Sequence, residues 1–421
     1  MGQRKRRHRT RRWGRVLILI PVVAIITVVL VQFVFVSASE SVDTRPQGAF
    51  YVAPASIPAG HPGAILRSQP HAVPKAMGAP AGTTATSVLY SSTDYATGKP
   101  IAVSGVVYQP PASPTPRGGR PVIAWAHGTV GVAAPCAPSL LANPPQRMQP
   151  GFASFLQAGW VVTTTDYTGL GTQGPNPYLI GASSGREVLD SVRAAQRLPG
   201  TGAGNKVIIW GHSQGGHSAL FAGDLAKSYA PELKVQGVAV AAPAAELAEL
   251  MRLDAGSVSG VVFSSFALWS WSHTVPGADL SAVVSSSGRD LIDAIASRCI
   301  SSNLSLVEDL PAAIEAQKTG VINAARLQAN PTWAAIEAEN TPPLSGKGPP
   351  MFIAQGTADT VIRPVTTAQV VATLCKRGRD VQSLLMPGVQ HPTAGQVAAP
   401  SMFAWAKVLL AGGHPAGNCP T

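Results

Sequence analysis

A serine lies between two glycines in the stretch GHSQGGH, residues 211–217. The apolar run KVIIW comes directly before this stretch, and the helix-forming segment SALFAGDLAKSYA follows it. A G-x-S-x-G sequence between a strand and a helix is typical of a tight turn that exposes the serine hydroxyl at the end of the strand. The context therefore predicts that Ser213 is a nucleophile. A purely structural turn is the alternative, because the chain is rich in glycine.

A nucleophilic serine needs a general base that accepts its proton. His212 precedes the serine on the strand, so we expect its side chain to point to the other side of the turn. His217 lies one helical turn further on and is expected to pack on a half-buried helix. His391, in GVQHPTAG, follows the last strand-like run, where a loop is expected to overhang the serine. We therefore assign His391, and neither neighbour of the serine, as the base.

The imidazole base needs a buried acid that orients it and stabilises its charged form. Asp359, in AQGTADTVIRP, follows the strand-like run PPMFIAQ and precedes His391 by 32 residues. Glu246 and Asp166 are the rival acids, each placed after a different strand. Asp166 is expected to stabilise a loop beside the pocket. Topology favours Asp359 and predicts the chain order Ser213, Asp359, His391.

Two backbone N–H groups are expected to bind the oxyanion that forms when a serine attacks a carbonyl. The helix after Ser213 supplies one of them, the N–H of Gln214. The loop AWAHGTVG, residues 124–131, is expected to supply the other. We assign it to Thr129, with a possible contribution from its hydroxyl, and expect Gly128 to let the loop turn close to the serine.

Strand-like runs and amphipathic segments alternate along the chain. The later runs are continuously apolar, as expected for strands buried on both faces of a mostly parallel sheet. The runs are TSVLYSS, IAVSGVVYQP, PVIAWAHG, GWVVTTTDY, KVIIWGHS, VQGVAVAAPA, PPMFIAQGTAD and QSLLMPGV. Alternation of strand and helix predicts an α/β fold with a central sheet flanked by helices. Its core is expected in two parts, residues 86–242 and 348–421.

Residues 243–347 interrupt this alternation with successive helix-like segments, which predicts an inserted helical cap. One of these segments, VVFSSFALWSW, places Phe263, Phe266 and Trp269 three residues apart on one side of a helix. These aromatic side chains are candidates for binding an acyl chain or facing lipid. Alternatively, they seat the cap on the core.

The charge is concentrated at the N-terminus. Eight of the 32 Lys and Arg residues lie in the first fifteen positions, so the rest of the chain has 24 basic against 21 acidic residues, a balance of +3. This balance argues against a nucleic-acid partner.

A 21-residue apolar run follows the basic start at 16–36. Residues 1–38 are therefore predicted to be either a secretory signal or an uncleaved membrane anchor, with the remainder outside the membrane. Residues 39–85, rich in Pro, Gly, Ala and Ser, are expected to form an extended arm over the core.

The chain contains four cysteines, Cys136, Cys299, Cys375 and Cys419, and no pair has the spacing of metal ligands. In an exported chain, an even number predicts two disulfides with three possible connectivities. Free buried thiols are the alternative. We expect no metal and no cofactor.

Taken together, these motifs resemble those of the secretory lipase family of α/β-hydrolases. The resemblance rests on YVAPASIPAGHPGAILR, AHGTVG, TDYTGLGT, the stretch from Tyr178 through REVLDSVRAA, GHSQGGH, GTADTVI and the loop of His391. It implies an α/β-hydrolase fold with a helical lid at the predicted cap, a Ser213–Asp359–His391 triad and water as the acyl acceptor. It also implies the bridges Cys136–Cys299 and Cys375–Cys419. The cap is the part that matches the family least clearly.

The expected activity is hydrolysis of carboxylic esters of lipids. Acyl transfer to another acceptor and peptide hydrolysis would use the same triad. A non-catalytic binding protein on this fold is a further alternative, because a fold alone does not prove an activity. Such a protein would be expected to lack Ser213, Asp359 or His391, and all three residues are present.

Overall fold

A nine-stranded sheet runs through the part of the chain that the computed structural model describes, residues 41–141, 149–300 and 310–419. The predicted leader, residues 1–38, and the choice between signal and anchor lie outside the described residues. Within the described ranges, no helix combines the length and apolar character needed to cross a membrane.

The strands lie in the order β1-β2-β3-β5-β4-β6-β7-β8-β9. Their bounds are β1 Ile65–His71, β2 Thr84–Thr93, β3 Pro100–Gln109, β4 Arg120–Ala126, β5 Val161–Thr165, β6 Ala203–His212, β7 Lys234–Ala241, β8 Met351–Gly356 and β9 Val381–Met386. Strands β1, β2 and β3 pair antiparallel, and β3 pairs antiparallel with β5. All pairs from β5 through β9 are parallel. All eight predicted runs are strands, and the predicted mostly parallel α/β sheet is confirmed.

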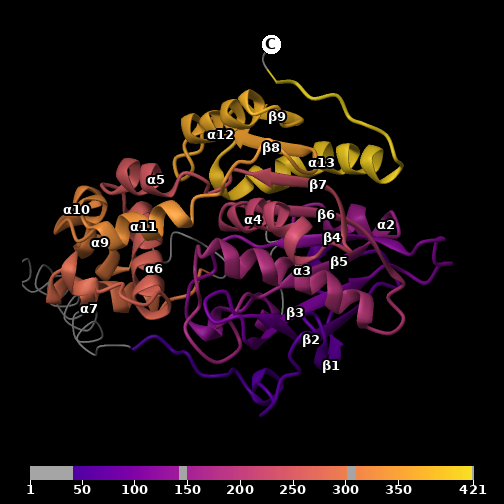
Figure 1. Cartoon of the computed structure of the whole chain (residues 1–421), viewed down its shortest axis with the longest axis horizontal. Helices are drawn as coiled ribbons and strands as arrows, with labels where there is room; N and C mark the ends of the chain where they lie inside the picture. Colours follow the sequence, from indigo (N-terminus) through magenta and orange to yellow (C-terminus); the bar gives the residue numbers. More distant parts are fainter. Residues whose placement is uncertain (1–40, 142–148, 301–309, 420–421) are drawn as a thin grey trace, which may run out of the picture. The chain divides into compact units, whose positions relative to one another are not determined.

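Helices cover both faces of the sheet (Figure 1). One apolar cluster joins the sheet to α3 (Gly181–Arg197), α4 (Gln214–Tyr229) and α12 (Pro364–Lys376). On the opposite face, a second cluster includes α2 (Phe152–Gln157) and α13 (Ala394–Leu410). Adjacent strand residues alternate between the two clusters, with Val122 and Ala124 in the first and Ile123 and Trp125 in the second. The continuously apolar strands therefore reflect burial on both faces.

All described elements between β7 and β8 are helical. They are α5 Leu247–Asp254, α6 Val258–Thr274, α7 Ser286–Ala296, α9 Pro311–Lys318, α10 Ala324–Ala329 and α11 Pro331–Glu339, with a short 3₁₀ turn at Leu280–Ala282. We call residues 243–347 the helical insertion. Its helices gather beside one end of the sheet (Figure 1). They share the apolar cluster of α2 and α13, so the insertion packs directly on the core.

Part of the predicted arm belongs to the sheet. Strand β1 pairs with β2 at the edge of the sheet, whereas we expected residues 39–85 to form an extended arm over the core. Its side chains are exposed or only partly buried, and the strand contains Pro70. Because an edge strand of this kind has no apolar alternation and tolerates proline, its sequence resembles that of a loop.

Both disulfides implied by the family resemblance are present. Cys136, after β4, is bonded to Cys299, which follows α7 within the helical insertion. Cys375 of α12 is bonded to Cys419 near the C-terminus. The first bridge joins the insertion to the core, and the second holds the tail beside β9, where the Asn418 N–H donates to the carbonyl of Val381.

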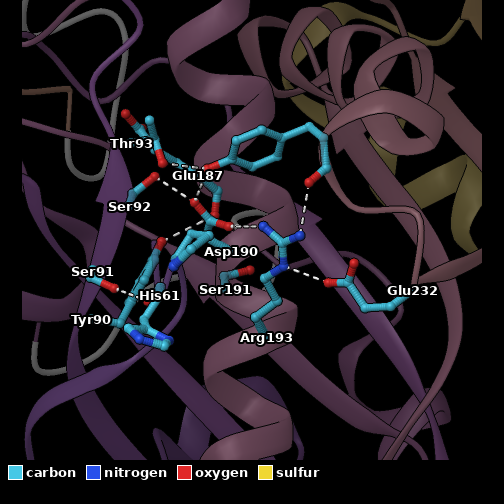
Figure 2. Close-up of polar contacts among 12 residues, drawn as sticks. His61, Tyr90, Ser91, Ser92, Thr93, Glu187, Asp190, Ser191, Arg193 and Glu232 are labelled. Atoms are coloured by element: carbon cyan, nitrogen blue, oxygen red, sulfur yellow. Dashed lines mark hydrogen bonds and ion pairs between the residues drawn. The ribbon is translucent and has the colours of Figure 1, made fainter. Parts of the chain in front are cut away.

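A buried polar network ties α3 to its neighbours (Figure 2). Asp190 of α3 is fully buried, and burial raises the pKa of its carboxyl. Its oxygens accept hydrogen bonds from Ser92 of β2 at 2.7 Å, Tyr229 of α4 at 2.8 Å and Arg193 at 2.8 Å. Arg193 also binds Glu232 at 2.6 Å. A strand and two helices are thus joined through one carboxylate.

Replacing Arg193 with methionine should destabilise the fold strongly, since Asp190 would remain buried without its cation. We expect the free energy of unfolding in urea to fall by about 3 kcal/mol, as is usual when one partner of a buried ion pair is removed. Arg252→Met is the control, because the Arg252 side chain of the Arg252–Glu249 pair is exposed, and its loss should be much smaller than that of Arg193→Met. Equal losses in the two variants would contradict a structural role for the network.

Candidate active site

Ser213 lies at a strained turn between β6 and α4. Its backbone has φ 59° and ψ −121°, which is unusual for a residue with a side chain. The two flanking glycines make the turn possible. A Cβ on Gly211 would lie 2.0 Å from the carbonyl oxygen of Gly215, and a Cβ on Gly215 would lie 1.9 Å from that of Ala126. The G-x-S-x-G spacing is therefore required because backbone from β4, β6 and α4 meets here.

His391 joins Ser213 to Asp359 through two hydrogen bonds. Its Nε2 lies 2.9 Å from the Ser213 Oγ, and its Nδ1 lies 2.8 Å from the Asp359 Oδ2. All three residues are buried. The structure thus brings together three residues that are distant along the chain. Ser213 and Asp359 are 146 residues apart, and Asp359 and His391 are 32 residues apart.

Backbone contacts hold the Asp359 carboxylate in place. Its Oδ1 accepts the N–H groups of Val361 at 2.9 Å and Ile362 at 2.8 Å, which leaves Oδ2 for the imidazole. An ionised carboxylate accepts hydrogen bonds only, so the neutral imidazole must carry its proton on Nδ1. The lone pair on Nε2 then faces the hydroxyl of Ser213, as a general base requires.

His212 and His217 make their hydrogen bonds away from the serine hydroxyl. The Nε2 of His212 donates to the carbonyl of His391 at 3.0 Å, and the Nε2 of His217 donates to the carbonyl of Asn340 at 2.7 Å. Burial lowers the pKa of His212 to about 3 and that of His217 to about 4. His217 is packed as predicted. His212 is closer to the site than predicted, because its ring lies 4.7 Å from that of His391.

The two rival acids have other roles. Asp166 accepts hydrogen bonds from the hydroxyl of Ser104 and from the backbone N–H of Ser139, so it holds a loop beside the sheet. Glu246 directly precedes α5, and partial burial raises its pKa. Neither accepts the hydrogen bond from the imidazole, which goes to Asp359.

A pocket opens onto Ser213 between the sheet edge and the helical insertion. Its volume is about 60 Å³, which is room for a few water molecules at about 10–15 Å³ each. Most of its lining is apolar, from Tyr178, Leu179, Ala244, Leu247, Leu250, Met251, Phe263, Val361 and Ile362. Asp254 also lines it and pairs with Arg363 at 3.0 Å, which joins α5 to the loop after Asp359.

The predicted oxyanion donors face this pocket. Gln214 and Thr129 both line it with Ser213, and within the described chain neither backbone N–H donates to a backbone carbonyl. Gly128 lies close to the serine, since a Cβ on it would be 3.6 Å from the Ser213 Cβ. The hydroxyl of Thr129 lies 2.8 Å from that of Tyr178. No contact of Tyr178 with the site could be predicted, because nothing in its local sequence places it opposite Thr129.

The three aromatic residues of the insertion do not form one surface. Phe266 and Trp269 are 0% and 3% exposed, and Phe266 packs edge-on against Tyr178. Trp269 stacks on His273 of the same helix. Of the three, only Phe263 lines the pocket. Spacing of three residues distributes the side chains around part of the helix, so a lipid-facing aromatic row is not formed.

Comparison with known proteins identifies the family. A model of the family described as secretory lipase matches residues 151–418, more than half of the 421 residues. The chain belongs to the secretory lipase family. The matched range includes Ser213, Asp359 and His391.

Relatives of the chain are also found by direct comparison of sequences. Lipase A of Moesziomyces aphidis is 24% identical over 251 residues, which are 57% of this chain and 52% of that protein. A Mycobacterium tuberculosis protein named "Probable inactive lipase" is 26% identical over 239 residues, 54% of this chain and 52% of its own length. The chain thus spans about half the length of these curated relatives. The solved structure of Candida antarctica lipase A shares the α/β-hydrolase fold, with a TM-score of 0.72 and 21% identity over 89% of this chain and 88% of that chain.

The buried neutral histidine in α4 should make the fold sensitive to acid. Because the folded pKa of His217 is about 4 and an unfolded histidine titrates near about 6.5, the unfolded chain binds more protons between these values. Stability is therefore lost as pH falls from 6.5 to 4. Replacing His217 with glutamine, which keeps a donor for Asn340, should remove about 2–3 kcal/mol of this loss.

Urea unfolding of the wild-type protein and of the His217→Gln variant at pH 7.5 and pH 4.5 measures how much stability each loses on acidification. The contribution of His212 is common to both proteins and cancels. A His61→Gln variant is the control, because the side chain of His61 is exposed. If the His217→Gln and wild-type proteins lose the same stability between the two pH values, His217 is not the source of the acid sensitivity.

Proposed function

We propose that this chain is an exported serine hydrolase that cleaves carboxylic esters of lipids. The observation that carries the proposal is the continuous hydrogen-bond chain Ser213 Oγ–His391 Nε2 and His391 Nδ1–Asp359 Oδ2, at 2.9 and 2.8 Å. Nucleophile, base and orienting acid are each within hydrogen-bond reach of the next, at the mouth of an apolar pocket. Membership of the secretory lipase family supports an ester of a lipid as the substrate.

In the proposed first half-reaction, the Ser213 Oγ attacks the ester carbonyl while His391 takes its proton. Asp359 stabilises the imidazolium that results, and the N–H groups of Gln214 and Thr129 bind the oxyanion. Collapse of the tetrahedral intermediate breaks the bond to the alcohol, which leaves with the proton from the His391 Nε2. The acyl group remains on the serine as an ester.

In the second half-reaction, water takes the place of the alcohol. His391 removes a proton from the water as it attacks the acyl-enzyme, and the same N–H groups bind the second oxyanion. The carboxylic acid then leaves, and the proton returns to the Ser213 Oγ. Each step uses the same three side chains, so no further acid or base is required.

We further propose that residues 243–347 act as a cap over the substrate pocket. The residues that line the pocket come from both the core and the insertion, so a bound acyl group would lie between the two. Phe263, together with Leu247 and Met251 of α5, supplies apolar surface for the acyl group. Phe266 and Trp269 instead hold α6 in place through burial.

Export is proposed from the family description, the disulfides and the N-terminal sequence. The family is one of secreted lipases by its description, and two disulfides are characteristic of proteins that fold in an oxidising compartment. A basic start followed by the apolar run at 16–36 fits the same destination.

Replacing Ser213 with alanine tests the proposed nucleophile. We expect turnover of a nitrophenyl ester to fall to the background rate, about 10⁵–10⁶-fold below wild type, while the melting temperature stays close to that of wild type. Retained turnover would refute the assignment. Absence of turnover in the wild type across esters from acetyl to long-chain acyl, and in a triglyceride emulsion, would favour the non-catalytic alternative.

Replacing Asp359 with asparagine tests the proposed acid. The amide can donate to Nδ1 and thereby favour the tautomer with its proton on Nε2, which cannot accept from Ser213, so kcat should fall by about 10⁴-fold. Glu246→Gln is the matched control, since Glu246 was the rival acid, and should change kcat by less than about twofold. A larger loss in Glu246→Gln than in Asp359→Asn would reverse the assignment.

Product analysis separates hydrolysis from its alternatives. With an added alcohol, a hydrolase releases mainly the free acid, whereas an acyltransferase releases mainly the new ester. Parallel assays with a peptide amide test for peptidase activity. Predominant transfer or amide cleavage would replace the proposed reaction while leaving the nucleophile unchanged.

A further inference from the structure

Tyr178 connects the helical insertion to the loop that faces Ser213. Its hydroxyl lies 2.8 Å from the Thr129 Oγ1, and both residues line the pocket with Ser213 and Gln214. The tyrosine is 3% exposed, and burial raises the pKa of its hydroxyl, so the group stays protonated. A protonated hydroxyl is available as a hydrogen-bond donor.

The direction of this hydrogen bond follows from the acidities of the two hydroxyls. A phenol is a stronger donor and a weaker acceptor than an aliphatic alcohol, because the ring draws electron density from its oxygen. At 2.8 Å either hydroxyl can be the donor, and this difference in acidity favours donation from Tyr178 to the Thr129 Oγ1. This leaves the single proton of Thr129 free to point into the pocket, where the oxyanion of the proposed reaction would form.

Helix α6 of the insertion sets the position of Tyr178. Its backbone N–H donates to the Ser270 Oγ at 2.8 Å, and its carbonyl accepts from the Trp271 Nε1 at 2.9 Å. Ser270 in turn donates to the carbonyl of Asn176 at 2.6 Å, and Phe266 packs on the tyrosine ring. Ser270 and Trp271 are fully buried. The tyrosine is thus held on both sides of its peptide by one helix.

We propose that Tyr178 is a positioning residue for the oxyanion site: its hydroxyl orients that of Thr129 towards the reacting carbonyl, and α6 orients Tyr178. The inference rests on the proposed function and adds to it. It makes the insertion a part of the catalytic geometry as well as a cover for the pocket. A displaced α6 would lower the rate of acylation even for a short substrate that does not need the space.

Tyr178→Phe is the direct test, because it removes only the hydroxyl. With a short nitrophenyl ester, we expect kcat to fall about tenfold and KM to change less than about twofold, since the lost interaction acts on the transition state. Thr129→Val should lower kcat by about 10²-fold, near the cost of losing one oxyanion donor. Thr129→Ser, which keeps a hydroxyl, should lose less than Thr129→Val.

The double variant tests whether the two hydroxyls act as one unit. If Tyr178 acts through Thr129, Tyr178→Phe combined with Thr129→Val should be no slower than Thr129→Val alone. Affinity for a boronic acid, which forms a tetrahedral adduct with a serine, should weaken in Tyr178→Phe in parallel with kcat. Affinity for the planar carboxylate product should not change. A merely structural role would not separate the two ligands.

Tyr95→Phe is the matched control. The Tyr95 hydroxyl donates to the carbonyl of Thr274 at 2.6 Å, so it also joins the core to α6, but the residue does not line the pocket. Its kcat should stay within about twofold of wild type. Ser270→Ala, which frees the peptide of Tyr178 without altering any group in the pocket, should lower kcat. Melting temperatures establish that each variant is folded.

Wild-type kcat in Tyr178→Phe, or independent and additive losses in the double variant, would overturn the inference. The proposed function fails separately. If Ser213→Ala keeps its turnover, the nucleophile is wrong. If Ser213→Ala is inactive and Tyr178→Phe is fully active, only the role of Tyr178 is wrong.

Discussion

The close approach of three backbone segments at Ser213 is the constraint on which the rest of the site depends. Strand β4 ends against Gly215, and Gly211 at the end of β6 faces the same turn, each so closely that a Cβ would overlap a carbonyl oxygen. This packing holds the serine at φ 59° and starts α4 immediately after it. The Ser213 Oγ is thereby directed away from the sheet, and the N–H of Gln214 remains free for a ligand. Strain at one residue is maintained by the surrounding sheet and helix.

Buried polar groups at the sheet edge are then positioned by backbone donors and acceptors. Asp359 is fixed by two N–H groups of its own loop, and the carbonyl of His391 accepts from His212. His212, beside Ser213, therefore supports the loop of His391, which contacts the Ser213 Oγ. The insertion contributes in a similar way, since α6 binds the peptide of Tyr178 through Ser270 and Trp271. In this member of the secretory lipase family, the helical insertion and the core share one apolar cluster and are joined by hydrogen bonds.

Much of the fold could be predicted because the strands are buried on both faces. Eight continuous or alternating runs gave eight strands, and the order of the loops after them placed Ser213, Asp359 and His391 at one edge, where the carboxyl ends of parallel strands meet. Strand β1 could not be predicted, because its exposed side chains and Pro70 carry no periodic signal. The choice between the two alternatives for the aromatic residues of α6 could not be made from the sequence, since helical spacing does not reveal which neighbour covers each side chain.

By itself, the sequence determined the candidate nucleophile and the chain order of its candidate partners. Both depend on local requirements: glycines where no Cβ fits, and loops that directly follow buried strands. Only the tertiary structure decided that His212 supports His391, that Phe263 alone of the three aromatics reaches the pocket, and that Tyr178 faces Thr129 from 49 residues away. These contacts depend on how the insertion packs against the sheet edge. That packing is set by the shapes of many side chains at once, and no short stretch of sequence encodes it.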